Sequence, residues 1–113
     1  MDKKIKAKWV KALRSGKYKQ GTGVLFNGEK HCCLGVLCVV LGMKPRQTEI
    51  SKTTGFDEWS FGRGSVAFLP PTAVRKSKIT DDSGALPSGG SLLALNDAGT
   101  SFERIAEIIE REL

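Results

Sequence analysis

The sequence predicts a small single α+β domain over residues 1–113, with an N-terminal helix, a β-hairpin, a buried central helix, short strands and loops, and a C-terminal helix. Three observations predict it. Each end of the chain carries an amphipathic helical pattern, an Asn-Gly pair separates two short runs of residues, and an unbroken apolar segment follows. A chain of this length buries roughly two-thirds of its unfolded surface, which is enough for a core without disulfides or a structural metal.

The first predicted helix covers residues 3–15. Ile5, Trp9 and Leu13 recur every fourth residue and form an apolar stripe along one face. Asp2 precedes the helix and is a residue type that caps helix N-termini. We therefore expect this helix to pack onto the domain through Trp9.

A β-hairpin is predicted over residues 22–33. The pair Asn27-Gly28 is the strongest two-residue hairpin signal, because a type I′ turn needs positive φ at both of its central positions. A turn centred on these two residues pairs Phe26 with Glu29 in the flanking strands.

The central element, residues 33–42, is apolar on every side and is expected to be buried. Periodicity cannot separate a buried helix from a buried strand in such a segment. Its three valines favour a strand, whereas its length, the Gly42 stop and Pro45 just beyond favour a helix. We expect a helix.

Shorter elements are predicted between the central helix and the last one. Residues 65–69 are expected to form a short strand, and two prolines permit a short helix over about residues 71–76. A long loop over residues 77–91 follows. Ser91 is expected to cap a single helical turn that residues 96–99 then break.

The last helix has the clearest pattern in the chain. Thr100 precedes Glu103 by three residues, which is the spacing of a capping box. We expect its apolar face to consist of Phe102, Ile105, Ala106, Ile109 and Leu113.

The positive charge of the chain is concentrated near its N-terminus. Residues 1–20 carry eight basic residues and one acid, a charge of +7, whereas the other 93 residues carry −1. Such asymmetry favours an anionic partner, with a solvated helix face as an equally good explanation.

His31 and the three cysteines, Cys32, Cys33 and Cys38, lie in one segment. A cysteine at a helix N-terminus can act as a nucleophile, but the sole histidine is beside the cysteines rather than in a distant segment. A structural zinc site needs two separate pairs of ligands. We therefore predict no catalytic residue, no metal and no cofactor, and we expect reduced, buried thiols.

The location of the protein is predicted from two absences. The longest apolar run, from Cys32 to Leu41, is about half of the ~20 residues that a membrane-spanning helix needs. The N-terminus does not have the pattern of a signal peptide. We expect a cytoplasmic protein without a membrane partner.

Two glycine-rich loops could present backbone amides to a phosphate group. They are residues 62–64 and residues 88–92, of which the second precedes a predicted helical turn. Neither matches a Walker or dinucleotide fingerprint, and turn chemistry is the simpler explanation of both.

Four motifs occur in an order that resembles a widespread group of small phage and prophage proteins. They are Trp9-x-x-Ala12-Leu13-Arg14-Ser15-Gly16-x-Tyr18-x-Gln20, Cys32-Cys33-Leu34-Gly35-Val36-Leu37-Cys38, Leu69-Pro70, and Leu95-Asn96-Asp97-x-Gly99-x-Ser101-Phe102-x-x-Ile105-Ala106-x-x-Ile109-Glu110. The resemblance implies a setting in the host cell cytosol and no specific activity. Small accessory phage proteins often blunt host defences by sequestering a nucleotide signal, by blocking an effector, or by mimicking DNA, and the basic charge disfavours mimicry.

We therefore expect a phage-type, non-catalytic binding protein that counters host defence by capturing an anionic target, such as a nucleotide-derived immune signal. The candidate ligand-binding residues are Lys4, Lys8, Lys11, Arg14, Lys17, Lys19 and Arg63 for charge, and Trp59 and Phe61 for stacking.

Two alternatives stay open. The protein could be an inhibitor or adaptor that binds an acidic host protein or a nucleic acid through the same basic helix. It could also be a cysteine-dependent enzyme. The oligomeric state stays open too, because sequestering proteins often place a ligand between subunits of a homo-oligomer.

Overall fold

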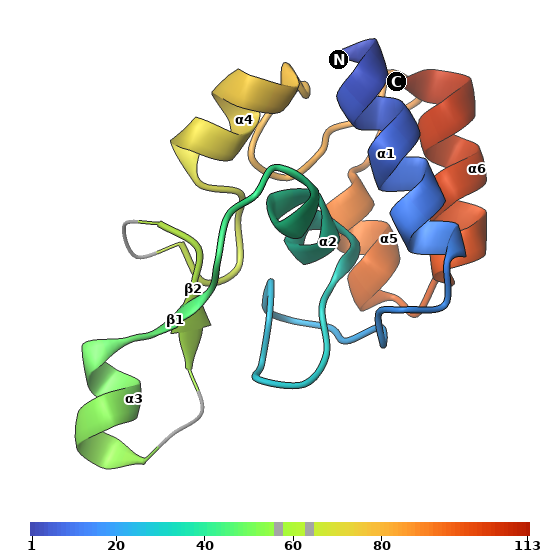
Figure 1. Ribbon diagram of the computed structural model, residues 1–113. Coiled ribbons are helices and arrows are strands. Elements are labelled where there is room, and N and C mark those ends of the chain that lie inside the picture. The colour runs from blue at the N-terminus through green and yellow to red at the C-terminus, as the bar shows by residue number, and fades with distance from the viewer. Residues whose placement is uncertain (56–57, 63–64) are drawn as a thin grey trace.

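The computed structural model describes residues 1–55, 58–62 and 65–113 (Figure 1). Within these residues the chain forms six helices and one two-stranded antiparallel sheet, so the predicted α+β class is confirmed. The helices are α1 (Lys3–Arg14), α2 (Cys33–Val40), α3 (Glu49–Thr54), α4 (Pro71–Ser77), α5 (Leu92–Asp97) and α6 (Phe102–Glu112), and the strands are β1 (Arg46–Gln47) and β2 (Trp59–Ser60).

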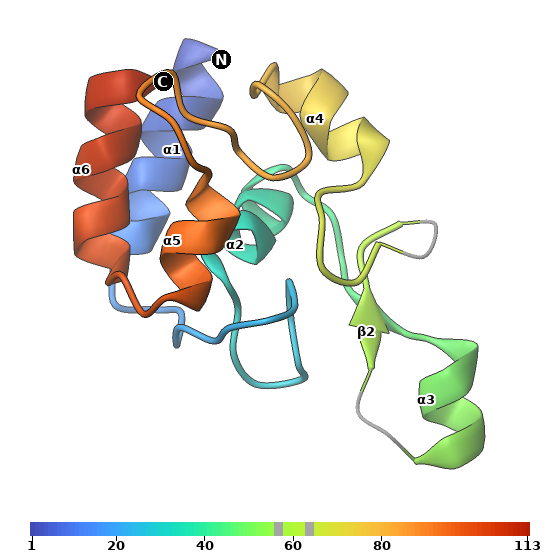
Figure 2. The ribbon, with the colours of Figure 1, turned by 180° about the vertical axis from the view of Figure 1, so that it is seen from behind.

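Four of the helices enclose the core. Helix α1 contacts α6 and α2, and α5 contacts α2 and α6 (Figures 1 and 2). Trp9, Leu37 and Ile105 are among the fully buried side chains of this core. The indole Nε1 of Trp9 donates a hydrogen bond to the carbonyl oxygen of Cys33 at 2.9 Å, so the expected anchor of α1 also ties it to the start of α2.

The two ends of α1 follow the sequence pattern. The side chain of Asp2 accepts a hydrogen bond from the backbone N–H of Ile5 at 2.9 Å, as an N-cap does. Gly16, two residues past the last helical residue, adopts a left-handed φ of 75°. This helix starts and stops for local reasons, and its position was therefore predictable.

The central element is a helix, as predicted. Cys32 is its N-cap residue, with extended backbone, and its sulfur accepts a hydrogen bond from Gly35 N–H at 3.4 Å. Gly35 allows the close approach of a neighbouring segment, because a Cβ at this position would lie 2.0 Å from the carbonyl oxygen of Leu25. The segment from Cys33 to Cys38 is buried throughout.

Residues 22–33 are all described, and they form an isolated bridge between Phe26 and His31 instead of the predicted β-hairpin. The predicted pairing of Phe26 with Glu29 is wrong by two residues. The side chain of Asn27 accepts hydrogen bonds from the backbone N–H groups of Glu29 (2.9 Å) and Lys30 (2.7 Å). This turn chemistry of the asparagine moves the centre of the turn one residue along the chain.

The middle of the chain forms an arm that the sequence did not predict. Strands β1 and β2 pair with Gln47 opposite Trp59, and α3 connects them at the tip, away from the four core helices (Figure 2). Thr48 holds this arm together, because its Oγ1 accepts from Ser51 N–H at 3.2 Å and donates to the Glu58 carboxylate at 2.7 Å.

The short elements after the arm agree only in part with the prediction. Residues 65–69 form a loop rather than the predicted strand, whereas α4 and the loop from residue 78 to residue 91 match the prediction. The carbonyl oxygen of Val66 accepts a hydrogen bond from Leu25 N–H at 2.8 Å, and Leu69 N–H donates to Asp82 O at 2.9 Å. These are single contacts to two different segments, so no strand pairing develops.

Helix α5 runs longer than predicted, and α6 starts one residue later than predicted. Ser91 caps α5 as expected, but α5 continues through Asn96 and Asp97, which were predicted to break it. The N-cap of α6 is Ser101 rather than Thr100, since the Ser101 side chain accepts from Arg104 N–H at 3.2 Å. The predicted apolar face is confirmed, with Leu113 partly buried and with Ile108 as an additional buried residue.

Candidate functional site

Six of the seven predicted cations are exposed along α1 and the segment after it. Lys4, Lys8, Lys11 and Arg14 are exposed on α1, and Lys17 and Lys19 are exposed just beyond its end. We call the surface formed by Lys3, Lys4, Lys6, Lys8, Lys11, Arg14 and Lys17 the basic α1 surface.

A groove between α1 and α6 runs along the basic α1 surface. Its volume is about 800 Å³, and Lys3, Lys6, Lys11 and Arg14 contribute to its walls. Ala7 and Val10 form an apolar part of the lining. The groove therefore combines positive charge with apolar surface.

A second, smaller hollow adjoins this groove at the C-terminal end of α1. Its volume is about 220 Å³, and we call it the Tyr18 hollow. It shares Lys11 and Ser15 with the groove, and it is also lined by Lys8, Ala12, Lys17 and Tyr18. An aromatic ring thus lies beside three cations.

Tyr18 is held in place by a row of rings. Its ring contacts His31 edge-on, with centroids 5.3 Å apart and planes at 87°. The row continues from His31 to Phe26 (4.4 Å) and from Phe26 to Trp59 (5.2 Å). Burial lowers the pKa of His31, so the neutral imidazole is favoured within this row.

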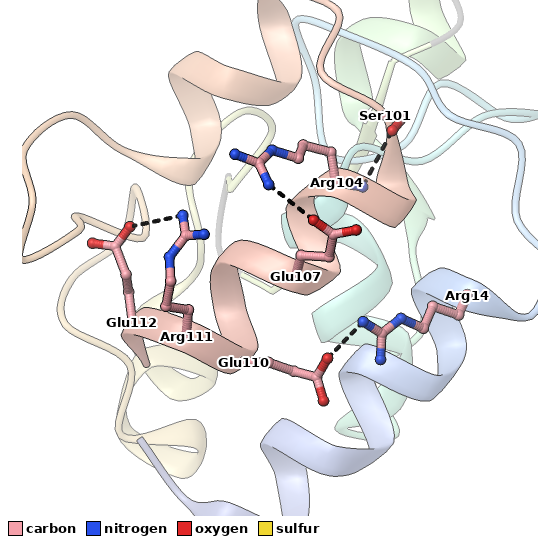
Figure 3. A network of polar contacts seen from close by, with 7 residues as sticks. All are labelled: Arg14, Ser101, Arg104, Glu107, Glu110, Arg111 and Glu112. Carbon is pink, nitrogen blue, oxygen red and sulfur yellow. Dashed lines mark hydrogen bonds and ion pairs between the residues drawn. The ribbon is translucent and has the colours of Figure 1, made fainter.

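Ion pairs already use part of the predicted charge. Arg14 on α1 reaches Glu110 on α6 at 2.5 Å (Figure 3), and Lys19 pairs with Glu29 at 3.3 Å. Among the described residues, Lys8, Lys11 and Lys17 form no ion pair. The Tyr18 hollow is therefore lined by cations without an ion pair and by an aromatic ring.

The predicted stacking residues lie elsewhere. Phe61 is fully buried in the core and presents no ring face to a ligand, so the stacking role predicted for it is wrong. Trp59 is partly buried on β2, at the end of the row of rings remote from Tyr18. Arg63 lies outside the described residues. The aromatic residue that does accompany the cations, Tyr18, lies within the first motif but was not among the predicted ligand-binding residues.

The predicted phosphate loop at residues 88–92 is occupied by contacts within the chain. Ser88 N–H donates to the Glu112 carboxylate at 3.0 Å, and Gly89 N–H donates to Leu86 O at 2.9 Å. The other predicted loop includes residues 63 and 64, which lie outside the described residues.

Asn96 organises the segment that carries Tyr18. It is fully buried, its Oδ1 accepts from Cys33 N–H and from Gln20 Nε2 at 3.0 Å each, and its Nδ2 donates to Gly21 O at 2.8 Å. Gln20 Nε2 also donates to the Thr100 carbonyl at 2.6 Å. The backbone groups that the Asn96 side chain binds, Cys33 N–H and Gly21 O, are therefore distant from it in sequence.

The three thiols are free and lie in the core. Burial raises the pKa of Cys32 to about 11 and that of Cys38 to about 12, and it raises the pKa of Cys33 well above its usual range. Cys33 Sγ donates to the carbonyl oxygen of Leu92 at 3.7 Å. The effect of burial on the thiol pKa thus outweighs the effect of the helix N-terminus, and the thiols are protonated at neutral pH.

We expect iodoacetamide at pH 8 to label none of the cysteines in the folded protein and all three after denaturation. The reason is that alkylation requires a thiolate within reach of the reagent, whereas these thiols are buried and protonated. Mass spectrometry of the intact protein counts the labels. Rapid labelling of Cys32 or Cys33 in the folded protein would contradict this placement and would favour a cysteine nucleophile.

The comparisons with known proteins bear on the family only. A family model described as "Domain of unknown function (DUF8296)" matches residues 1–113. No curated protein and no solved structure matches the chain. In the described part of the chain, no helix has the length and apolar character needed to cross a membrane, and no three histidine, cysteine or acidic side chains are grouped to hold a metal ion.

Proposed function

Since the chain belongs to the DUF8296 domain family, whose description names no activity, we propose a function from its own surface: it is a non-catalytic binding protein that captures an anionic ligand at the basic α1 surface. One observation carries the proposal. The Tyr18 hollow places an aromatic ring beside Lys8, Lys11 and Lys17, next to a larger groove with further cations.

This combination suits a nucleotide. Phosphate oxygens are attracted to Lys11 and Lys17, and a base can stack on the Tyr18 ring; base–aromatic stacking is worth about 1–3 kcal/mol in single-stranded nucleic acid complexes. The attraction of one phosphate charge to one ammonium at 4 Å is about 1 kcal/mol in water and about 4 kcal/mol near a protein surface. Several cations around one hollow therefore favour a ligand with more than one negative charge.

The resemblance to phage proteins makes the proposal more specific. The ligand we propose is a nucleotide-derived immune signal, which the protein would sequester in the cytosol of the host cell without altering it. The positive charge of the first 20 residues supports an anionic signal of this kind.

A second candidate function is supported by the apolar part of the groove. Ala7 and Val10 lie between cations over a helix of 12 residues, which is about 18 Å long. Such a groove also suits an acidic, amphipathic segment of a host protein. Its capture from a host lysate, together with no response to nucleotides, would favour this inhibitor or adaptor.

We expect isothermal titration with a panel of cyclic and linear nucleotides to reveal binding of one class. Affinity should fall with salt concentration, because phosphate contacts release counterions. The bound nucleotide should be recovered chemically intact after the protein is denatured. Absence of heat from every nucleotide would overturn the proposal, and recovery of a cleaved product would overturn its non-catalytic part.

A further inference from the structure

A third hollow, remote in sequence from the basic α1 surface, lies between α4 and the loops on either side of it. Its volume is about 760 Å³, and its apolar lining includes Val66 and Val74. Phe68 belongs to the same lining and is 50% exposed. A half-exposed aromatic ring beside an apolar hollow is typical of the centre of a protein interface.

Both signs of charge occur at this hollow. Arg75 on α4 and Asp82 in the following loop contribute to its lining, and both are exposed. Neither takes part in an ion pair within the described part of the chain. The neighbouring Asp81 differs, because its carboxylate accepts from Ser83 N–H (2.9 Å) and Ala85 N–H (3.0 Å).

A patch with one cation and one anion, neither of which forms an ion pair among the described residues, can pair with a copy of itself. In a two-fold symmetric dimer, each contact between two different residues occurs twice, with the roles of the two copies exchanged. Arg75 of each copy can then face Asp82 of the other, while each Phe68 enters the opposite hollow. The basic α1 surface cannot serve in this way, because two such surfaces repel each other.

We propose that a second copy of this chain docks on the surface formed by Phe68, Val66, Val74, Arg75 and Asp82, and that the protein is a two-fold symmetric dimer. A foreign apolar peptide is the competing occupant, but a mixed pair of uncommitted charges favours a copy of the same surface. The proposal is independent of the ligand proposed for the basic α1 surface.

The test is sedimentation velocity of the full chain over a range of protein concentrations. We expect a dimer for the wild-type protein and a dissociation constant raised about 30-fold or more by Phe68→Asp. Ile50→Asp is the matched control, because Ile50 on α3 is, among the described residues, the other large apolar side chain that is exposed (58%). It should leave the dimer unchanged.

A charge series tests the same interface without the aromatic ring, and it applies even if Phe68→Asp fails to fold. Arg75→Glu should weaken the dimer, because like charges then face each other, and the pair Arg75→Glu with Asp82→Arg should restore it. A wild-type protein that stays monomeric up to about 1 mM would overturn the proposal. A dimer that is unaffected by both Phe68→Asp and Arg75→Glu, or that is lost in Ile50→Asp, would also overturn it.

Discussion

Replacement of Asn96 by leucine is expected to lower the free energy of unfolding by about 3–5 kcal/mol. Leucine has a similar size but no polar atoms, so it leaves the buried Cys33 N–H and the carbonyl oxygen of Gly21 without their partner, and Gln20 Nε2 keeps only its bond to the Thr100 carbonyl. A buried group left without a partner costs about 1–3 kcal/mol. Urea unfolding followed by far-UV circular dichroism measures the change.

The neighbouring Asp97 provides a matched control. Its exposed carboxylate accepts one hydrogen bond, from Gly23 N–H at 2.9 Å. Asp97→Ala should therefore cost about 0.5–1.5 kcal/mol. Equal losses in the two variants would contradict the role of Asn96 as the buried link between α2, α5 and the segment that carries Tyr18.

Gly35→Ala is the second change with a large expected effect, about 3 kcal/mol of destabilisation. In an ordinary helix interior, alanine is more stabilising than glycine by roughly 0.5–1 kcal/mol. Here the added Cβ would lie 2.0 Å from the carbonyl oxygen of Leu25, so α2 and the segment that contains Leu25 must separate. The sign of the effect is thus the reverse of the intrinsic helix preference.

Gly16→Ala measures the cost in stability of a left-handed backbone without a steric clash. A Cβ on Gly16 would meet no heavy atom within 4 Å, but the residue has φ of 75°. We expect a cost of about 1–2 kcal/mol from this left-handed backbone alone. The same denaturation measurement applies, and a gain in stability from Gly35→Ala would contradict the close packing of α2 against Leu25.

The parts of the fold that the sequence predicted are those with local causes. Helix α1 has its cap at Asp2 and its stop at Gly16, and α4 begins at a proline. The burial of α2 followed from a segment without polar residues. For these elements the determining residues lie within one turn of the boundary.

The arm formed by β1, α3 and β2 depends on contacts that no local pattern records. Each strand has two residues, too few for an alternating pattern. The arm is closed by the bond from Thr48 to Glu58, ten residues apart. The turn after Phe26 was displaced for a different, local reason, because the Asn27 side chain binds the backbone N–H groups of Glu29 and Lys30 and so selects another register.

The candidate site was predicted for its charges and not for its aromatic residue. Clustered lysines are visible in the sequence, and α1 places Lys8 and Lys11 on one hollow. The ring of Tyr18 comes beside them because His31, 13 positions further along the chain, supports it. Phe61 was misjudged because an aromatic residue next to a glycine can be buried or exposed with the same local sequence.

The proposal that the basic α1 surface captures an anionic ligand is tested most directly by two lysine variants. We expect Lys11→Glu and Lys17→Glu each to weaken nucleotide binding about tenfold or more, since each replaces an attraction by a repulsion at the Tyr18 hollow. Lys44→Glu is the control, because it changes the net charge equally at an exposed position away from this hollow.

The measurement is isothermal titration of the four proteins with the nucleotide that binds the wild-type chain. The account predicts near-wild-type affinity for Lys44→Glu and strongly reduced affinity for Lys11→Glu and Lys17→Glu, with all three variants folded by circular dichroism. Unchanged affinity in Lys11→Glu and Lys17→Glu, or the same loss in Lys44→Glu, would contradict it.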